Sequence, residues 1–147
     1  MLLILSCGKK KDNKLKNHKM QALKAYIGPM FQVIKKAERE RRLGSNIFIG
    51  IISAKYGFLR NSDYIEYYDM KINRKLAKEY NPKILSQIRK WHNEENFNLI
   101  YILMGKDYLE TVEGISKYID TQIIIENMGG LGVGQKKLVK FIEKYSL

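Results

Sequence analysis

Four segments of the sequence combine glycine with lysine, hydroxyl or amide side chains, and each follows a short apolar run. Glycine lets backbone N–H groups come close to a ligand, and lysine neutralises phosphate. Glycine also makes tight turns without any ligand, but its presence in all four segments favours one shared site for an anion. The candidate binding residues in these segments are Ser6, Lys9, Lys10, Lys55, Lys106, Asp107, Tyr108, Gly130, Gly132, Gly134 and Lys136.

Cys7 is the only cysteine, and it stands beside Lys9 and Lys10. Neighbouring cations favour the thiolate form of a thiol, so Cys7 is a candidate nucleophile. Neither histidine, His18 or His92, has a spacing that suggests a base for it. The commoner alternative is a small buried cysteine with no chemical role.

The segment 53–72 is rich in tyrosine and carboxylate residues. Tyr56 and Tyr68 could stack on a base or hydrogen-bond to one, and Asp63 or Asp69 could bind its edge or move a proton. A connection of this length is usually functional or contains short structure. We take Asp69, Tyr56 and Ser53, with Cys7, as candidate catalytic residues. The alternative is a loop that folds over the sheet and buries its own rings.

Residues 9–24 contain seven lysines, which form either an arm that follows phosphates or a solvated helix face. The segment 130–134 resembles the hairpin of a helix-hairpin-helix motif, whose amides hold a DNA phosphate. The apolar run before it indicates a strand, whereas that motif needs a helix there. A phosphate contact at 130–134 is therefore better supported than a complete motif.

Four continuous apolar runs predict the strands that position these residues. The runs are 2–5, 47–52, 99–103 and 122–125. Continuous runs of this kind are typical of strands buried on both faces of a parallel sheet. Right-handed crossovers then bring every carboxyl end to one edge of the sheet, and the site is expected there, where the strand order reverses.

Helical patterns lie between these runs. Pro29 begins one helix, and Asn73 can cap another that we expect to break or restart at Pro82. Asp107 begins a capping-box-like pattern, and a C-terminal helix follows Gly134. The sequence thus predicts one α/β domain over 1–147, with a four-stranded, mostly parallel sheet flanked by helices. We expect the long 53–72 loop to cover the carboxyl ends of the strands.

The composition narrows the function classes. The chain has 147 residues, 27 Lys and Arg against 15 Asp and Glu, and a formal charge of +12. This charge indicates a polyanionic partner or, alternatively, only a soluble surface. One cysteine and two histidines exclude a disulfide framework and a Cys/His zinc site. No apolar run is long enough to span a membrane, so we expect a cytoplasmic protein without a membrane partner. We also expect no metal and no cofactor.

The segment 52–60 has the sequence Ile-Ser-Ala-Lys-Tyr-Gly-Phe-Leu-Arg and is followed by Asp63 and Tyr68-Asp69. It resembles the Leu-Ser-x-x-Tyr-Gly-x-Leu segment of the YaaA family (peroxide stress protein YaaA). The opening residues 3–10 resemble the first strand and turn of that family and of its short uncharacterised relatives. This resemblance implies a stress-response α/β protein with a basic cleft, nucleic-acid binding and a relation to base-handling enzymes such as glycosylases.

Three functions remain open on the sequence alone. The first is binding of nucleic acid, DNA before RNA, with base-directed chemistry such as glycosidic-bond cleavage or exchange in the strand-end cleft. The second is an enzyme acting on a free nucleotide or nucleoside. The third is a non-catalytic nucleic-acid-binding module. The sequence does not determine the oligomeric state.

Overall fold

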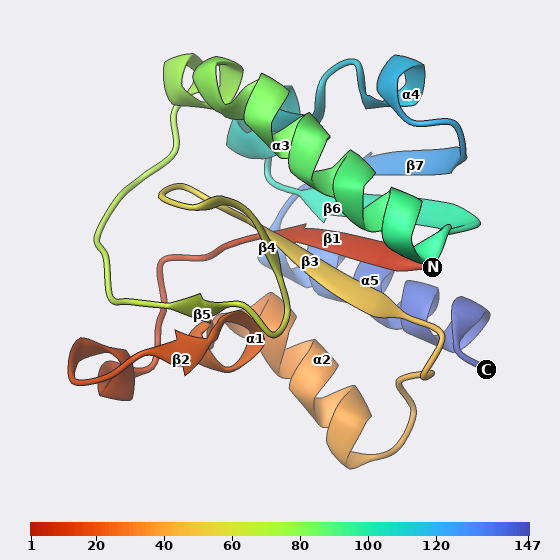
Figure 1. Ribbon diagram of the computed structural model, residues 1–147. Coiled ribbons are helices and arrows are strands. Elements are labelled where there is room, and N and C mark those ends of the chain that lie inside the picture. The colour runs from red at the N-terminus through yellow and green to blue at the C-terminus, as the bar shows by residue number, and fades with distance from the viewer.

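The computed structural model describes all 147 residues, and a five-stranded mixed sheet forms its centre (Figure 1). The strands are β1 (Leu2–Ser6), β3 (Phe48–Ser53), β4 (Gly57–Arg60), β6 (Leu99–Met104) and β7 (Gln122–Asn127). Their order is β4-β3-β1-β6-β7. The strands β3, β1, β6 and β7 run parallel and coincide with the four apolar runs, which confirms the prediction of a mostly parallel sheet.

The prediction of four strands is wrong, because β4 adds a fifth. It pairs antiparallel with β3, from Gly50↔Arg60 to Ser53↔Gly57. Gly57 has a φ of 77°, a left-handed conformation that glycine adopts readily and that lets the chain reverse. Gly50 leaves room for the ring of Phe58, since a Cβ there would lie 2.5 Å from Phe58 Cε1. Two apolar residues in a four-residue strand carry little periodic signal, so the sequence pattern does not show this strand.

The predicted loop 53–72 contains a second short strand, β5 (Tyr64–Ile65). It pairs antiparallel with β2 (Met20–Gln21) in a separate two-stranded sheet. The irregular remainder, which we call segment 66–73, connects β5 to the long helix that follows. Figure 1 shows it as the yellow-green stretch on the left.

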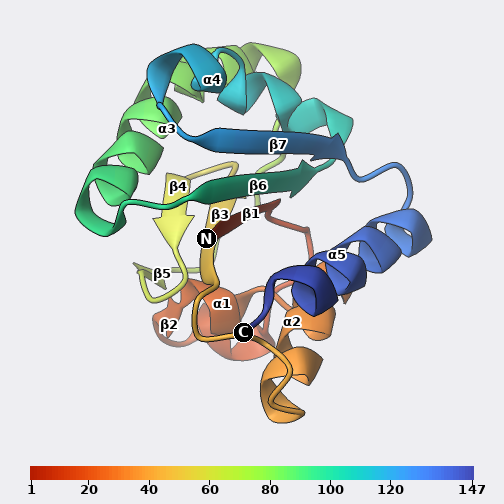
Figure 2. The ribbon, with the colours of Figure 1, turned by 90° about the vertical axis from the view of Figure 1, so that its right-hand side faces the viewer.

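Helices cover both faces of the sheet, as expected (Figure 2). One face carries α1 (Ala22–Ala25), α2 (Pro29–Arg39) and α5 (Leu131–Tyr145). The other carries α3 (Arg74–Glu95), α4 (Ile115–Tyr118) and the 3₁₀ helix η2 (Lys106–Val112), and a second 3₁₀ helix, η1 (Asn13–Lys16), precedes β2. Leu3 and Leu5 pack with α2 and α5, whereas Leu2 and Ile4 pack with α3. Burial on both faces is the physical reason for the continuous apolar runs of β1, β3 and β6. The edge strand β7 differs, because none of its residues is fully buried and Ile125 is exposed.

Three helix predictions need correction. The helix α3 does begin after Asn73, whose side chain accepts a hydrogen bond from Leu76 N at 2.8 Å, but it continues through Pro82. Its buried stripe, which includes Ile84 and Trp91, holds it together across the proline. The stretch after Asp107 is a 3₁₀ helix, and α5 begins at Leu131 and not after Gly134. None of the helices combines the length and the apolar character that crossing a membrane requires.

Candidate functional site

A pocket of about 320 Å³ lies between the carboxyl ends of β1 and β6. These two strands stand where the order of the sheet reverses, because the chain passes from β1 to β3 on one side and then to β6 on the other. Open α/β sheets bind ligands at this position. The residues that line the pocket are Cys7, Gly8, Lys9, Met70, Lys71, Ile72, Asp107 and Tyr108. We call it the β1/β6 pocket.

Two lysines, Lys9 and Lys71, share the wall of this pocket. The pKa of Lys9 is lowered, first by its side-chain contact with Lys71 and by repulsion from that ammonium group, while the charge of Asp69 acts in the opposite direction. Neither lysine has a carboxylate within ion-pair distance. Two neighbouring cations repel each other. An anion bound between them would therefore reduce an electrostatic repulsion that is present in the free protein.

A buried hydroxyl network lies behind the pocket and is centred on Tyr68. Its hydroxyl is hydrogen-bonded to Tyr26 at 2.5 Å and to Ser53 at 2.9 Å, and it donates weakly to Cys7 Sγ at 3.7 Å. Cys7 Sγ also lies 3.1 Å from the hydroxyl of Tyr108. The network thus connects the ends of β1 and β3 to segment 66–73 and to η2.

Burial raises the pKa of Tyr26, Tyr68 and Tyr108 above the ordinary value of a phenol. The charge that Cys7 acquires on ionisation opposes a second negative charge nearby and adds to each of these shifts. All three phenols are therefore neutral at physiological pH and act as hydrogen-bonding groups. They do not supply a base to the pocket.

Segment 66–73 is held at its beginning by Tyr56. The hydroxyl of Tyr56 accepts a hydrogen bond from Glu66 N at 2.9 Å, and its ring packs edge-on against Tyr68 at 5.7 Å. Ser53 Oγ accepts hydrogen bonds from the backbone N–H groups of Lys55 and Tyr56, at 3.2 and 3.1 Å. Ser53 is fully buried, so this serine and Tyr56 fix the turn after β3.

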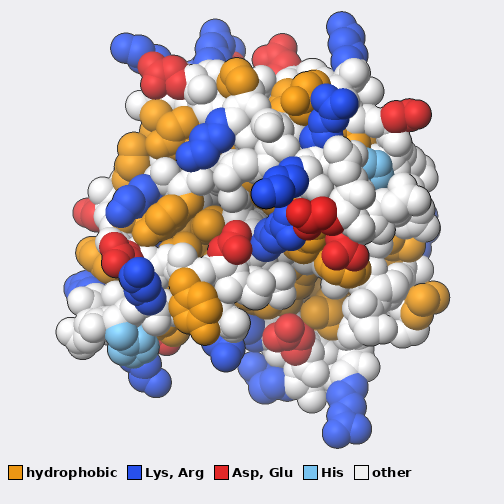
Figure 3. Space-filling view, in the orientation of Figure 1, with side chains coloured by type: hydrophobic (Ala, Val, Ile, Leu, Met, Phe, Trp, Pro, Cys, Tyr) orange, Lys and Arg blue, Asp and Glu red, His pale blue; other side chains and the backbone are white.

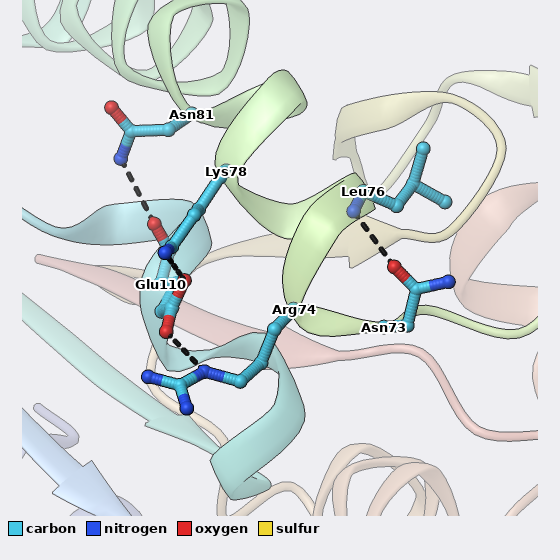
Figure 4. A network of polar contacts seen from close by, with 6 residues as sticks. All are labelled: Asn73, Arg74, Leu76, Lys78, Asn81 and Glu110. Atoms are coloured by element: carbon cyan, nitrogen blue, oxygen red, sulfur yellow. Dashed lines mark hydrogen bonds and ion pairs between the residues drawn. The ribbon is translucent and has the colours of Figure 1, made fainter.

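The opposite wall of the pocket comes from η2, which is fixed to the first turns of α3 (Figure 4). Glu110 Oε1 accepts a hydrogen bond from Arg74 Nε at 2.6 Å, and its other oxygen lies 4.0 Å from Lys78 Nζ. Asn81 Nδ2 lies within 3.0–3.1 Å of the carbonyl oxygens of residues 110, 111 and 113. These contacts satisfy the last carbonyls of η2 and hold Asp107 and Tyr108 at the pocket.

The structure brings together only part of the predicted site. Four of the predicted residues line the β1/β6 pocket, and these are Cys7, Lys9, Asp107 and Tyr108. Ser53 and Tyr68 belong to the network behind it, and Ser6 is half-buried at the end of β1. Lys10, Lys55 and Lys106 are exposed and do not line the pocket.

The two candidate carboxylates of the 53–72 segment have different surroundings. Asp63 Oδ2 accepts a hydrogen bond from Arg60 N at 2.8 Å and so stabilises the turn between β4 and β5. Asp69 is exposed, makes no hydrogen bond, and lies close enough to Lys9 to affect its pKa. Asp107 is the one carboxylate residue that lines the pocket.

The glycines at the start of α5 lie outside this pocket. Gly134 is buried inside the helix, where a Cβ would come within 2.2 Å of Met128 Cγ, so it serves close packing. Gly130 is exposed at the N-cap of α5. Gly132 and Lys136 line a larger groove of about 820 Å³ between α2 and α5. Since that groove holds only these two of the predicted residues and lies away from the strand reversal, we place the candidate site at the β1/β6 pocket.

Two residues of the pocket and its network, Lys71 and Tyr26, are not among the site residues predicted from the sequence. Lys71 belongs to no strand end, so a search for lysines directly after apolar runs passes over it. Tyr26 follows α1 and reaches Tyr68 across 42 residues of sequence. No local sequence pattern distinguishes either residue as part of a site. The abundance of tyrosine and lysine around them is only a weak indication. No three His, Cys, Asp or Glu side chains are grouped so as to hold a metal ion.

Comparison with known proteins identifies a family but no function. A model described as "Family of unknown function (DUF6884)" matches residues 2–140. This family differs from YaaA, so the resemblance inferred from residues 3–10 and 52–69 is wrong, and the stress-response role drawn from it falls with it. The matching segment is short and rests on Ser53, Tyr56 and Gly57. Residues of these types are compatible with many turns that follow a strand, so they do not identify one family. A search of the curated proteins finds no match to this chain.

Proposed function

The chain belongs to this family of unknown function, DUF6884, and we propose that it binds nucleic acid by holding one phosphate-bearing nucleotide unit in the β1/β6 pocket. The observation that carries the proposal is the pair formed by Lys9 and Lys71 on the pocket wall, without a carboxylate partner. A phosphate placed between two ammonium groups can accept a charge-assisted hydrogen bond from each of them and reduces their mutual repulsion.

The surroundings of the pair support the same ligand class. The pocket lies at the strand reversal, where α/β sheets bind their ligands, and its volume of about 320 Å³ fits one small ligand unit. Only five of the 27 Lys and Arg side chains lie within ion-pair distance of an acid. The remaining positive charge favours a polymeric anion over a single small one. In this proposal, segment 66–73 covers the strand ends and closes one side of the pocket.

Binding of DNA and RNA oligonucleotides over a series of salt concentrations tests the proposal. We expect the variant that combines Lys9→Gln with Lys71→Gln to bind at least tenfold more weakly than the natural chain at low salt. The slope of log affinity against log salt should fall by about 0.7 for a single strand and about 0.9 for duplex DNA, since the contact with one phosphate is lost. The matched control combines Lys90→Gln with Lys117→Gln, two exposed lysines on α3 and α4.

Two outcomes contradict this function. The first is the absence of oligonucleotide binding by the natural chain, and the second is equal weakening by the test and control variants. Stabilisation by a free mononucleotide, without dependence on oligomer length, would instead support an enzyme or receptor for free nucleotides. Assaying DNA and RNA of the same sequence decides between the two polymers, of which we expect DNA.

Asp107 on the pocket wall favours a second candidate, in which the bound nucleotide undergoes glycosidic-bond cleavage or exchange. A carboxylate beside the sugar would stabilise the positive charge that develops as the base leaves, or activate water. Asp107→Asn should then retain oligonucleotide affinity and abolish release of the base. A natural chain that binds oligonucleotides and releases no base is a binding module.

A further inference from the structure

The tyrosines of segment 64–70 differ sharply in exposure, and this difference bears on how a nucleic acid would be recognised. Tyr64 is 65% exposed and Tyr67 is 44% exposed, with Met70 42% exposed beyond them. Tyr68, in contrast, is buried, and its hydroxyl is bonded to Tyr26 and Ser53. The faces available for stacking are therefore those of Tyr64 and Tyr67, and not that of Tyr68.

Lysines lie beside the rings of this segment. Lys16 Nζ is 5.3 Å from the centre of the Tyr67 ring, and Lys11 Nζ is 4.2 Å from the centre of the Tyr68 ring. In Figure 3, Lys and Arg side chains lie among hydrophobic side chains, a class that includes tyrosine, and a few Asp and Glu side chains over the left half of the face shown. That half holds β2, β5 and segment 66–73 (Figure 1). Aromatic rings interleaved with cations are the usual surface of proteins that bind single strands.

The exposed Tyr67 lies a short stretch of chain before the β1/β6 pocket. Tyr67 stands four residues before Lys71, and Met70, Lys71 and Ile72 line the pocket. Four extended residues span at most about 14 Å, so the backbone of Tyr67 lies within this distance of the backbone of Lys71. The segment Asp12–Ala25 packs against β5, because β2 within it pairs with β5. A hydrogen bond from Asp12 N to Ala25 O joins the two ends of this segment.

We propose that the nucleic acid is single-stranded, with bases stacked on Tyr67 and Tyr64 and with its backbone passing Lys16 and Lys11 toward the Lys9–Lys71 pair. This inference rests on the proposed function, since it names the strandedness of the same partner. A duplex hides the faces of its bases inside the helix, whereas a single strand offers them to exposed rings. Stacking does not depend on base identity, so little sequence preference is expected.

Competition among three ligands of equal length tests the inference. The ligands are a single-stranded oligonucleotide, its duplex, and an abasic strand with the same phosphates and no bases. We expect the natural chain to prefer the single strand. Replacing Tyr64→Ala and Tyr67→Ala together should weaken binding of the single strand by about fivefold or more for each stacked base. The affinity for the abasic strand and the salt slope should not change, because no charge is lost.

Tyr118→Ala is the matched control, because Tyr118 is a 40% exposed tyrosine on α4 beside Arg89. Tyr67→Ala alone, at a position outside the strands, keeps the test valid if the loss of Tyr64 disturbs β5. Preference for the duplex, or equal affinity of the Tyr67→Ala and Tyr118→Ala variants for the single strand, overturns this inference and leaves the pocket proposal intact. Binding of no oligonucleotide by the natural chain overturns the proposed function itself.

Discussion

The hydroxyl group of Tyr68 joins three parts of the chain that are distant in sequence. Its partners are Tyr26 after α1, Ser53 at the end of β3 and Cys7 after β1. A buried hydroxyl that is left without a partner costs more than an average hydrogen bond contributes. The network therefore fixes the middle of segment 66–73, whereas Tyr56 holds its beginning. The network also accounts for Cys7 as a packed, hydrogen-bonded thiol at the base of the pocket.

Replacing Tyr68→Phe should lower the free energy of unfolding by about 1–3 kcal/mol, because the hydroxyls of Tyr26 and Ser53 lose a buried partner. Urea denaturation followed by the fluorescence of Trp91, the only tryptophan, measures this change. The control Tyr67→Phe removes an exposed hydroxyl without hydrogen bonds and should change stability by less than about 0.5 kcal/mol. Equal losses in the two variants would show that the network contributes nothing to stability.

At the scale of elements, the pairing of α3 with η2 determines one wall of the candidate site. A 3₁₀ helix of seven residues has poor hydrogen-bond geometry and needs support from outside. Asn81 and Glu110 supply that support (Figure 4). Asn81 directly precedes Pro82, the residue at which sequence analysis expects α3 to break. The same turn of α3 that carries the proline therefore anchors η2, and the tertiary contact helps to keep the helix continuous.

Replacing Asn81→Ala should destabilise the fold by about 1–3 kcal/mol, since the carbonyl groups at the end of η2 lose their donor. Asn93→Ala is the control on the same helix, because Asn93 is exposed and makes no side-chain hydrogen bond. Both variants gain the same helix propensity, so their difference isolates the contact with η2. Thermal denaturation followed by circular dichroism measures both, and similar melting temperatures would contradict the assignment of Asn81 as an anchor.

At the scale of the whole molecule, the buried phenols couple global stability to pH. Burial raises the pKa of Tyr26 and Tyr68 in the folded state, whereas unfolding returns each phenol to its ordinary value near 10. Below about pH 10 both phenols are protonated in the folded and in the unfolded state, so their contribution to the free energy of unfolding is fully present. Above that pH the unfolded state loses protons that the folded state keeps, so stability falls as pH rises.

Each of the two phenols should therefore lower the free energy of unfolding by about 1.4 kcal/mol per pH unit above about pH 10. Parallel titrations of phenolate absorbance and far-ultraviolet circular dichroism measure the effect. Absorbance from the buried Tyr26 and Tyr68 is expected to rise together with the loss of helix signal. Complete ionisation of all ten tyrosines in a chain that keeps its native dichroism would refute this coupling.

The sequence by itself determined the α/β class, the four parallel strands and the edge of the sheet at which the candidate pocket lies. These features follow from local patterns, since a strand buried on both faces must be apolar throughout and a strand end must turn. Lys9, in the turn after β1, and Tyr108, in η2 after β6, could be placed at the pocket for the same reason.

Only the tertiary structure decided the rest, because it depends on contacts between distant residues. The strand β4 pairs at the edge of the sheet, and α3 continues through Pro82. Lys71 contacts Lys9, although 62 positions of sequence separate the two residues. Tyr68 is buried and Tyr67 is exposed, although the two are adjacent and of the same type. Side-chain type sets which chemistry is available, and packing against the remainder of the chain sets which side chains a ligand can reach.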